Sequence, residues 1–183
     1  MVTADDALVR EPDDAAHRDA AFARRSDAYL GRALGLAYYI VGDLHEAEDA
    51  TQEAMARAWK SRRSLRAPEA FDAWLDRIVV NTCRERLRRK RAVTEVELPD
   101  DGGGPEAADR FGALFARDAI GRAMAVLTVD QRTVVVLRYW RDLSLEQIAQ
   151  RLGWPMGTVK SRLHYGLAAL RVRLEQDETE VRQ

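Results

Sequence analysis

SLEQIAQRLG at residues 144–153 and GTVKSRL at residues 157–163 predict a short helix, a tight turn and a second helix. Ala149, Gly153 and Val159 stand where a helix-turn-helix needs a small residue, a turn glycine and a buried β-branched residue. The spacing therefore predicts a helix-turn-helix in this part of the chain.

Local signals mark the ends of both helices. Ser144 followed by Gln147 forms a capping box for the first helix. Gly153 can adopt the left-handed conformation that ends this helix, and Pro155 suits the first turn of the next one. These signals support the same two helices that the spacing predicts.

The second helix is expected to have an apolar side and a polar side. After Val159, its buried positions are expected to be Leu163, Leu167, Leu170 and Leu174. Its outward side chains, which can enter a DNA major groove, are Lys160, Ser161, His164 and Tyr165. A structural helical hairpin with a solvated basic face is the alternative. The agreement of spacing, turn chemistry and outward basic residues favours DNA binding.

Composition favours a soluble, mostly helical protein of the cytoplasm. The 183 residues are 46% hydrophobic and 32% charged, and no apolar stretch approaches the roughly 20 residues that a membrane helix needs. Acidic residues near the N-terminus replace the basic and apolar segments of a secretion signal. Cys83 is the only cysteine, which excludes an internal disulfide and fits a reducing compartment. We therefore expect no membrane insertion.

Basic residues are concentrated in two parts of the chain. Residues 57–91 contain twelve basic and four acidic residues, and residues 110–174 contain eleven basic and four acidic residues, although the formal net charge is -1. Two basic modules favour contact with a polyanion at two places, and hence with nucleic acid.

Between these modules, residues 93–109 read VTEVELPDDGGGPEAAD, which is typical of a flexible acidic linker. Helical patterns precede it at about residues 13–26, 28–41, 43–59 and 69–91, and follow it at about 110–126, 129–140, 144–152 and 156–175. We therefore expect an all-α fold of two small helical domains, with an N-terminal tail, a first domain, a linker, a second domain and a C-terminal tail at residues 1–21, 22–92, 93–109, 110–175 and 176–183.

Residues typical of catalysis do not converge in this sequence. His17, His45 and His164 stand alone, without a second histidine or a cysteine at metal-ligand spacing. The glycines at residues 102–104 lie in acidic sequence that would repel a phosphate. We therefore expect no enzymatic activity, no metal, no cofactor and no small-molecule substrate.

One strip of the helix predicted near residues 43–59 is polar. Asp49, Gln52, Glu53 and Arg57 share this strip, whereas the opposite side carries only small residues, Ala47, Ala50, Ala54 and Ala58. Because small residues allow close packing, the polar strip becomes an outward ridge that suits a protein partner. A solvated polar face is the alternative.

The helix predicted over residues 69–91 carries a basic row. Its polar side repeats at helical spacing through Arg77, Asn81, Arg84 and Arg88. Arginines in a row can follow a phosphate backbone, and the amide of an asparagine can pair with a base edge because it both donates and accepts. A merely solvated basic helix is an equal alternative.

Four motifs follow one another along the chain: EDATQEAMARAW (residues 48–59), FDAWLDRIVVN (71–81), LSLEQIA (143–149) and GTVKSRL (157–163). Together they resemble the sigma-70 family of sigma factors, of the extracytoplasmic-function (ECF, group 4) type, over about residues 22–174. Such factors consist of conserved regions 2 and 4 joined by a linker. The resemblance implies a factor that binds core RNA polymerase, directs it to −35 and −10 promoter elements and assists promoter melting.

The resemblance also implies protein partners. The ridge of Asp49, Gln52, Glu53 and Arg57 would bind the clamp helices of the polymerase β′ subunit, and the polymerase β flap would be a second contact. The acidic linker would run toward the RNA-exit path, with a solvated tether as the alternative. Many relatives are held inactive by an anti-sigma factor, which is therefore a further expected partner.

For promoter DNA, the resemblance implies two sites. The −10 element would be read by Asn81 and the loop at residues 62–67, which carries Arg62, Arg63 and Arg66, with one base flipped out of the stack. The −35 element would be read by Lys160, Ser161, His164 and Tyr165, with Thr158 and Arg162 nearer the backbone.

Two rival classes of protein remain. A helix-turn-helix regulator that acts without being a polymerase subunit would normally bind a palindrome as a dimer, and the sequence contains no evident dimerisation helix. An interaction protein, such as an anti-sigma factor or adaptor, would not need two basic modules.

Overall fold

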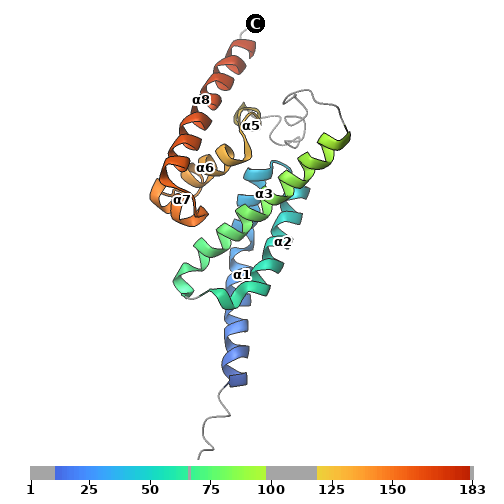
Figure 1. Cartoon of the computed structure of the whole chain (residues 1–183), viewed down its shortest axis with the longest axis vertical. Coiled ribbons are helices and arrows are strands. Elements are labelled where there is room, and N and C mark those ends of the chain that lie inside the picture. Colours follow the sequence, from blue (N-terminus) through green and yellow to red (C-terminus); the bar gives the residue numbers. More distant parts are fainter. Residues whose placement is uncertain (1–10, 66, 98–118, 182–183) are drawn as a thin grey trace, which may run out of the picture.

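The computed structural model describes residues 11–65, 67–97 and 119–181, and these residues form helices and short connections without a strand. In chain order the elements are α1 (Glu11–Val41), α2 (Leu44–Ser61), the 3-10 turns η1 (Arg62–Ser64) and η2 (Pro68–Ala70), α3 (Phe71–Glu97), α5 (Ala119–Ala125), α6 (Val129–Tyr139), α7 (Leu145–Leu152) and α8 (Met156–Val181). Helices α1, α2 and α3 pack on one another as a bundle, and α5 to α8 form a second group beside it (Figure 1). The expected all-α fold of two helical parts is confirmed.

Helix α1 is longer than the sequence predicted. The expected break between residues 26 and 28 is wrong, because the helix continues from Glu11 to Val41. Its buried side chains, Phe22, Tyr29, Ala33, Leu36 and Ile40, form one stripe at helical spacing that crosses the expected break. Leu30 lies off this stripe and is 48% exposed.

The small residues of α2 allow it to pack closely in the bundle. Asp43 caps the helix, and its side chain accepts a hydrogen bond from the Glu46 backbone N–H at 2.9 Å. The expected inward residues Ala47, Ala50, Ala54 and Ala58 are completely buried. Their short side chains let the backbone of α2 approach α1 and α3, which leaves the opposite polar face outward.

Helix α3 extends into the segment that was predicted as linker. Pro68 stands at the first position of η2, and α3 then runs from Phe71 to Glu97. The prediction is therefore wrong for residues 93–97, whose glutamates and valines are compatible with a helix before Pro99. The rest of the predicted linker, and the start of the helix predicted from residue 110, lie outside the described residues.

The helix-turn-helix is built as its sequence predicts. Ser144 and Gln147 form a reciprocal capping box, with hydrogen bonds of 3.2 and 2.8 Å. Gly153 adopts φ 68°, the left-handed conformation that ends α7. Val159 is completely buried at the start of α8. Further along α8, Leu167 is 37% exposed, so its expected burial is wrong.

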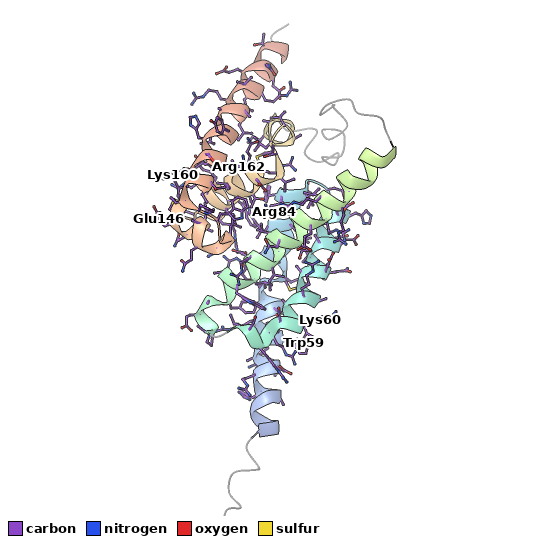
Figure 2. The ribbon with its side chains drawn as sticks, in the orientation of Figure 1. Trp59, Lys60, Arg84, Glu146, Lys160 and Arg162 are labelled. Carbon is purple, nitrogen blue, oxygen red and sulfur yellow. The ribbon has the colours of Figure 1, made fainter. Side chains whose placement is uncertain are left out.

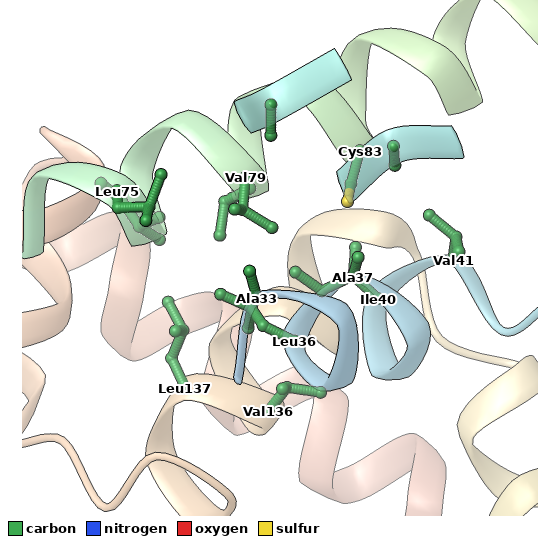
Figure 3. Packing of buried hydrophobic residues seen from close by; sticks show 14 of the residues in the cluster. Ala33, Leu36, Ala37, Ile40, Val41, Leu75, Val79, Cys83, Val136 and Leu137 are labelled. Atoms are coloured by element: carbon green, nitrogen blue, oxygen red, sulfur yellow. The ribbon is translucent and has the colours of Figure 1, made fainter. Parts of the chain in front are cut away.

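One apolar cluster passes from the bundle into the second group of helices. In Figure 3, Ala33 and Leu36 of α1 lie between Val79 of α3 on one side and Val136 and Leu137 of α6 on the other. All five side chains are at most 3% exposed. The two parts of the chain are therefore packed together through α1 rather than held apart.

Candidate polymerase and nucleic-acid interfaces

The ridge on α2 is supported from α3, and Arg86 makes the largest number of these contacts. Arg86 donates hydrogen bonds to Glu46 at 3.2 Å, Asp49 at 2.9 Å and Glu53 at 3.4 Å. Arg57 bonds to Glu53 at 2.6 Å and forms an ion pair with Glu85 of α3 at 2.7 Å. The ridge is thus an arginine–carboxylate network between two helices. Sequence reasoning missed Arg86 and Glu46.

These contacts favour the ionised form of the carboxylates. The hydrogen bond from Lys90 lowers the pKa of Glu46, against the opposing effect of burial, and Arg86 adds to the lowering. Burial acts to raise the pKa of Glu53, but the hydrogen bonds from Arg57 and Arg86 outweigh it, so the pKa is lowered. Asp49 and Gln52 are exposed beside these anchored residues. Glu46 and Glu53 are therefore ionised carboxylates that neighbouring basic side chains hold in place.

The loop that follows α2 is partly tied to α1. Arg62 forms an ion pair with Asp19 at 2.6 Å, and its guanidinium lies 4.1 Å from the centroid of the Trp59 ring. The hydrogen bond from Arg62 lowers the pKa of the Asp19 carboxyl. Arg63 is exposed, and Arg66 lies outside the described residues. Of the three arginines expected to face the −10 strand, only Arg63 is described as open to solvent.

Only part of the basic row on α3 is exposed to solvent. Arg77, Asn81 and Arg88 are exposed, as a DNA-binding face requires. Arg84 instead turns toward the second group of helices, where it forms an ion pair with Asp130 of α6 at 3.0 Å. Its guanidinium also lies 4.7 Å from the ring centroid of Trp154. In this structure Arg84 therefore contacts protein on two sides.

On α8, the predicted recognition side chains are mostly accessible. Lys160, His164 and Tyr165 are exposed, and the last two rings meet edge to face at 5.3 Å. Thr158 and Ser161 are half-buried, and the Ser161 hydroxyl donates a hydrogen bond to the Thr158 carbonyl at 3.0 Å. The structure thus gathers the expected residues on one helix after a well-formed turn.

The two candidate DNA surfaces meet at a junction between α3, α6 and α8. Arg162 of α8 lies 3.9 Å from the same Asp130 carboxylate that Arg84 contacts. Figure 2 shows Arg84 on α3 across the junction from Lys160 and Arg162 on α8. A cavity of about 230 Å³ lies here, and Arg84, Arg88, Asp130 and Arg162 are among the residues that line it. A −10 residue and a −35 residue of the prediction thus share a carboxylate partner.

A second polar cluster holds the two groups of helices together. Asp76 of α3 is completely buried and accepts hydrogen bonds from Tyr29 of α1 at 2.5 Å, from Arg141 at 2.7 Å and from Arg151 of α7. Burial raises the pKa of the Asp76 carboxyl to about 6, although the charge of Arg151 acts in the opposite direction. Burial also lowers the pKa of Arg141 to about 10.

Sequence reasoning missed this cluster, because the partners of Asp76 lie 47 to 75 residues away from it in the chain and share no local pattern with it. It also missed Arg132, which is 6% exposed and donates hydrogen bonds to carbonyls of Ile40, Met124 and Leu127. A charged residue directly before the buried run TVVVL was a signal that could have drawn attention to it.

Across the described residues, no group of three or more His, Cys, Asp or Glu side chains is placed to hold a metal ion. In the same part of the chain, no helix is long and apolar enough to cross a membrane.

Comparisons with known proteins assign both parts of the chain. The model of Sigma-70 region 2 matches residues 26–93, and that of Sigma-70, region 4 matches residues 123–172. The ECF RNA polymerase sigma factor SigW of Bacillus subtilis is 37% identical over 168 residues, which is 84% of this chain and 89% of SigW. This chain belongs to the ECF sigma factors of the sigma-70 family. The resemblance inferred from the four motifs is confirmed.

A second relative and a solved structure are also similar to this chain. The RNA polymerase sigma-E factor of Streptomyces antibioticus is 39% identical over 160 residues, which is 86% of this chain and 84% of that protein. The solved structure of the sigma factor RpoE in complex with the anti-sigma factor NepR, from Bartonella quintana, has the same fold, with a TM-score of 0.65, 24% identity and coverage of 84% of this chain and 96% of that one. Family membership favours a polymerase-associated sigma factor over a free-standing regulator. Sigma factors are transcription initiation factors.

Proposed function

We propose that this ECF sigma factor binds core RNA polymerase through α2, reads a −35 element with α8 and holds the opened −10 strand with α3. The observation that carries this proposal is the well-formed helix-turn-helix, whose capping box and left-handed Gly153 position an exposed recognition face on α8. The assignment of residues 22–92 to sigma region 2 and of residues 110–175 to sigma region 4 stays a prediction.

At the −35 element, Lys160, His164 and Tyr165 would contact base edges, because they are exposed near the start of α8, where a recognition helix enters the major groove. Ser161 would read the element beside them, and Thr158 and Arg162 would lie nearer the backbone. The edge-to-face contact of His164 with Tyr165 restricts both rings and so favours a defined reading surface.

At the −10 element, Asn81 would read a flipped base, and Arg77 and Arg88 would follow the phosphates. All three are exposed on α3, and Arg63 adds a fourth accessible polar side chain near the bundle. Opening a base-pair step costs on the order of a few kcal/mol, which capture of the flipped base can offset.

Core polymerase would bind the ridge. Asp49 and Gln52 are exposed there, and Glu53 is fixed by Arg57 and Arg86. A carboxylate that is already held in place loses less conformational freedom when it binds a basic partner surface. The β′ clamp helices are the proposed partner of this ridge, and the β flap is the proposed partner of the second domain.

The remaining expectations are also part of the proposal. The factor would act in the cytoplasm without enzymatic activity of its own. An anti-sigma factor would regulate it, which is supported by a relative of the same fold that was solved with the anti-sigma factor NepR. The acidic linker would run toward the RNA-exit path of the polymerase.

Run-off transcription on genomic promoter fragments tests the proposal. Core polymerase with the factor is expected to produce transcripts from defined start sites that core polymerase alone does not produce. Asn81→Ala should reduce open-complex formation while binding to core polymerase stays unchanged. Lys160→Ala should weaken −35 binding and lower the salt slope of that binding by about one, whereas the exposed Arg171→Ala on the same helix serves as the control.

No transcripts together with tight, palindrome-specific binding by the protein alone would contradict the proposal. Equal loss of polymerase binding in Asn81→Ala would contradict the −10 role of Asn81.

A further inference from the structure

The N-terminal half of α1 holds the loop between α2 and α3. Asp19, Phe22 and Arg25 follow one another at intervals of three residues on α1, and each contacts this loop or an aromatic ring at one of its ends. Because residues three apart are neighbours on a helix surface, the three side chains form one row along α1. The family model of region 2 begins at residue 26, so this row precedes the part of the chain that the family model matches.

The first contact fixes the start of the loop. Arg62 donates two hydrogen bonds to the Asp19 carboxylate, from Nε at 2.6 Å and from Nη2 at 2.8 Å. The same guanidinium donates to the Trp59 carbonyl oxygen at 2.9 Å and lies 4.1 Å from the centroid of the Trp59 ring. A bidentate arginine–carboxylate pair fixes the plane of the guanidinium, and the ring beside it restricts the side chain further. The turn η1 is therefore held against α1 and α2 through Arg62.

The second contact fixes the end of the loop. Arg25 Nη1 donates a hydrogen bond to the Pro68 carbonyl oxygen at 2.5 Å. This oxygen also accepts the backbone N–H of Phe71, at the start of α3. The proline ring fixes the φ angle of Pro68, and Ala67 before it is extended, with φ −131° and ψ 120°. The loop is thus anchored to α1 at both of its 3-10 turns.

Phe22 sets the position of α1 between these two contacts. Its ring meets the Trp59 ring at the end of α2 at 5.8 Å between centroids, and the Phe71 ring at the start of α3 at 5.7 Å. Both contacts are edge to face, and Phe22 is buried. Trp59 is labelled in Figure 2, near the end of α2. Asp19 and Arg25 therefore reach the loop from fixed positions on either side of Phe22.

The contacts of Arg62 decide its role in the loop. Its Nε–H, one N–H of Nη1 and one N–H of Nη2 already bond within the protein. Arg63, the next residue of η1, is exposed to solvent. Arg63 is therefore the arginine of η1 that can reach DNA, whereas Arg62 shapes the turn that presents it.

We propose that Asp19 and Arg25 are positioning residues for −10 recognition, which hold the loop, through Arg62 and Pro68, in the shape that reads the −10 strand. This inference rests on the proposed function, because it assumes that the loop contacts −10 DNA. A loop that is ordered before DNA binds loses less conformational freedom on binding. Loss of either contact therefore lowers the preference for the correct −10 strand.

Hydrogen exchange in the free, full-length protein tests the hold on the loop without any DNA. Asp19→Asn removes the charge that pairs with Arg62, and Arg25→Gln removes the donor to the Pro68 carbonyl. The backbone amides of η1 and η2 should exchange about fivefold faster, or more, in each variant. Asp27→Asn and Arg24→Gln make the same changes at exposed positions of α1 and serve as matched controls with the wild-type rate. Wild-type exchange in Asp19→Asn or in Arg25→Gln would overturn the role of the residue changed.

Binding of single-stranded −10 DNA by the holoenzyme tests the role in recognition. The probes are the non-template −10 strand of a promoter found by run-off transcription and the same strand with the flipped base replaced. Asp19→Asn and Arg25→Gln should lower the preference for the first strand about fivefold, whereas the two controls should keep the wild-type preference. A wild-type preference in a variant whose loop exchanges faster would overturn the positioning role.

Arg62→Gln distinguishes a positioning role from a phosphate contact. If Asp19 acts through Arg62, this variant and Asp19→Asn lose the same preference, and the double variant is no worse than either. The salt slope of binding should stay that of the wild type in all three. A slope lowered by about one in Arg62→Gln would show a direct phosphate contact and contradict the proposal. Tighter binding by Asp19→Asn would also contradict it, because Asp19 would then withhold Arg62 from DNA.

The two proposals fail in different ways. Run-off transcripts from the wild type, with unchanged exchange or an unchanged −10 preference in the variants, would remove the positioning role and leave the proposed function. No transcripts on any promoter fragment, with faster exchange in the variants, would remove the proposed function and the role in −10 recognition, while the hold of α1 on the loop would stand.

Discussion

Two arginine–carboxylate networks in this sigma factor use the same chemistry in opposite arrangements. Between α2 and α3, Arg86 is surrounded by Glu46, Asp49 and Glu53, all within region 2. Between the regions, the single carboxylate of Asp76 is surrounded by arginines of region 4. The first network can be broken only by disrupting the bundle, whereas the second can be relieved by separating two folded regions. The same ion pairs thus stabilise a fold in one place and join two folded regions in the other.

Burial explains a further difference between the Arg86 network and the Asp76 network. The acids of the Arg86 network are partly exposed, and hydrogen bonds to basic side chains lower the pKa of Glu46 and Glu53. Asp76 is completely buried, and this burial outweighs its arginines and raises its pKa to about 6. Acid is therefore expected to affect the two networks differently.

The largest expected effect comes from Arg86→Met. It leaves three carboxylates close together without their shared donor and should lower the free energy of unfolding by about 1–3 kcal/mol. Urea unfolding followed by circular dichroism measures this change. Arg89→Met is the matched control, because Arg89 is 63% exposed and reaches only Glu53, at 3.4 Å; its cost should stay below about 0.5 kcal/mol. Equal costs would mean that Arg86 does not organise the network.

The second-largest effect is expected from a change of pH, to which the two networks should respond differently. Arg151→Gln is expected to separate the two groups of helices at about pH 7 to 8, where Asp76 is ionised. The variant leaves this buried carboxylate with one positive charge fewer beside it. Arg141, Tyr29 and, at longer range, Asp72 and Arg32 also act on this carboxyl.

The sign follows from proton binding. While the two groups of helices are packed together the Asp76 pKa is raised, and loss of Arg151 raises it further, whereas a hydrated carboxyl in the separated molecule returns toward 3.8. The packed arrangement therefore binds more protons between these values, and a fall in pH toward 5 should bring the two groups of the Arg151→Gln variant together again. Energy transfer between fluorophores on Ala56→Cys of α2 and Ala168→Cys of α8, both at exposed positions, measures this. Transfer that stays low at pH 5 would contradict the assigned role of the Asp76 charge.

The Arg86 network should behave differently over the same range. The stability that Glu46 and Glu53 contribute is fully present above their unfolded pKa of about 4.5, and is lost only as the pH falls through their lowered folded values. The difference in urea unfolding midpoint between the wild type and Arg86→Met should thus be nearly constant between pH 7 and pH 5.

The smallest effect is expected at Cys83. Burial raises the pKa of this thiol to about 12, so it should react very slowly with a thiol reagent at pH 8 in the native protein. A double variant, Asp130→Asn with Arg151→Gln, should change this rate less than about twofold, because separation of the two groups of helices leaves region 2 folded. Arg86→Met should raise the rate about tenfold or more. Faster labelling in the double variant would show that the interface also stabilises region 2.

Features encoded by neighbouring residues were predicted from the sequence. The capping box at Ser144, the turn at Gly153 and the small-residue face of α2 all depend on spacings of a few residues, and the structure has each of them.

Other features depend on tertiary packing and were missed. The continuity of α1 past residues 26–28 is set by burial against α2 and α3, not by local propensity. Arg84 was assigned to a DNA face, but its partner Asp130 is 46 residues away, and no periodicity connects the two. The separation of the chain into two basic modules likewise gave no sign that they pack on each other.

Run-off transcription on genomic promoter fragments, with core polymerase alone and with core polymerase plus this factor, tests the central claim most directly. The account predicts transcripts from defined start sites only when the factor is present, and fewer of them with Asn81→Ala. No transcripts, together with tight, palindrome-specific binding by the factor alone, would contradict it.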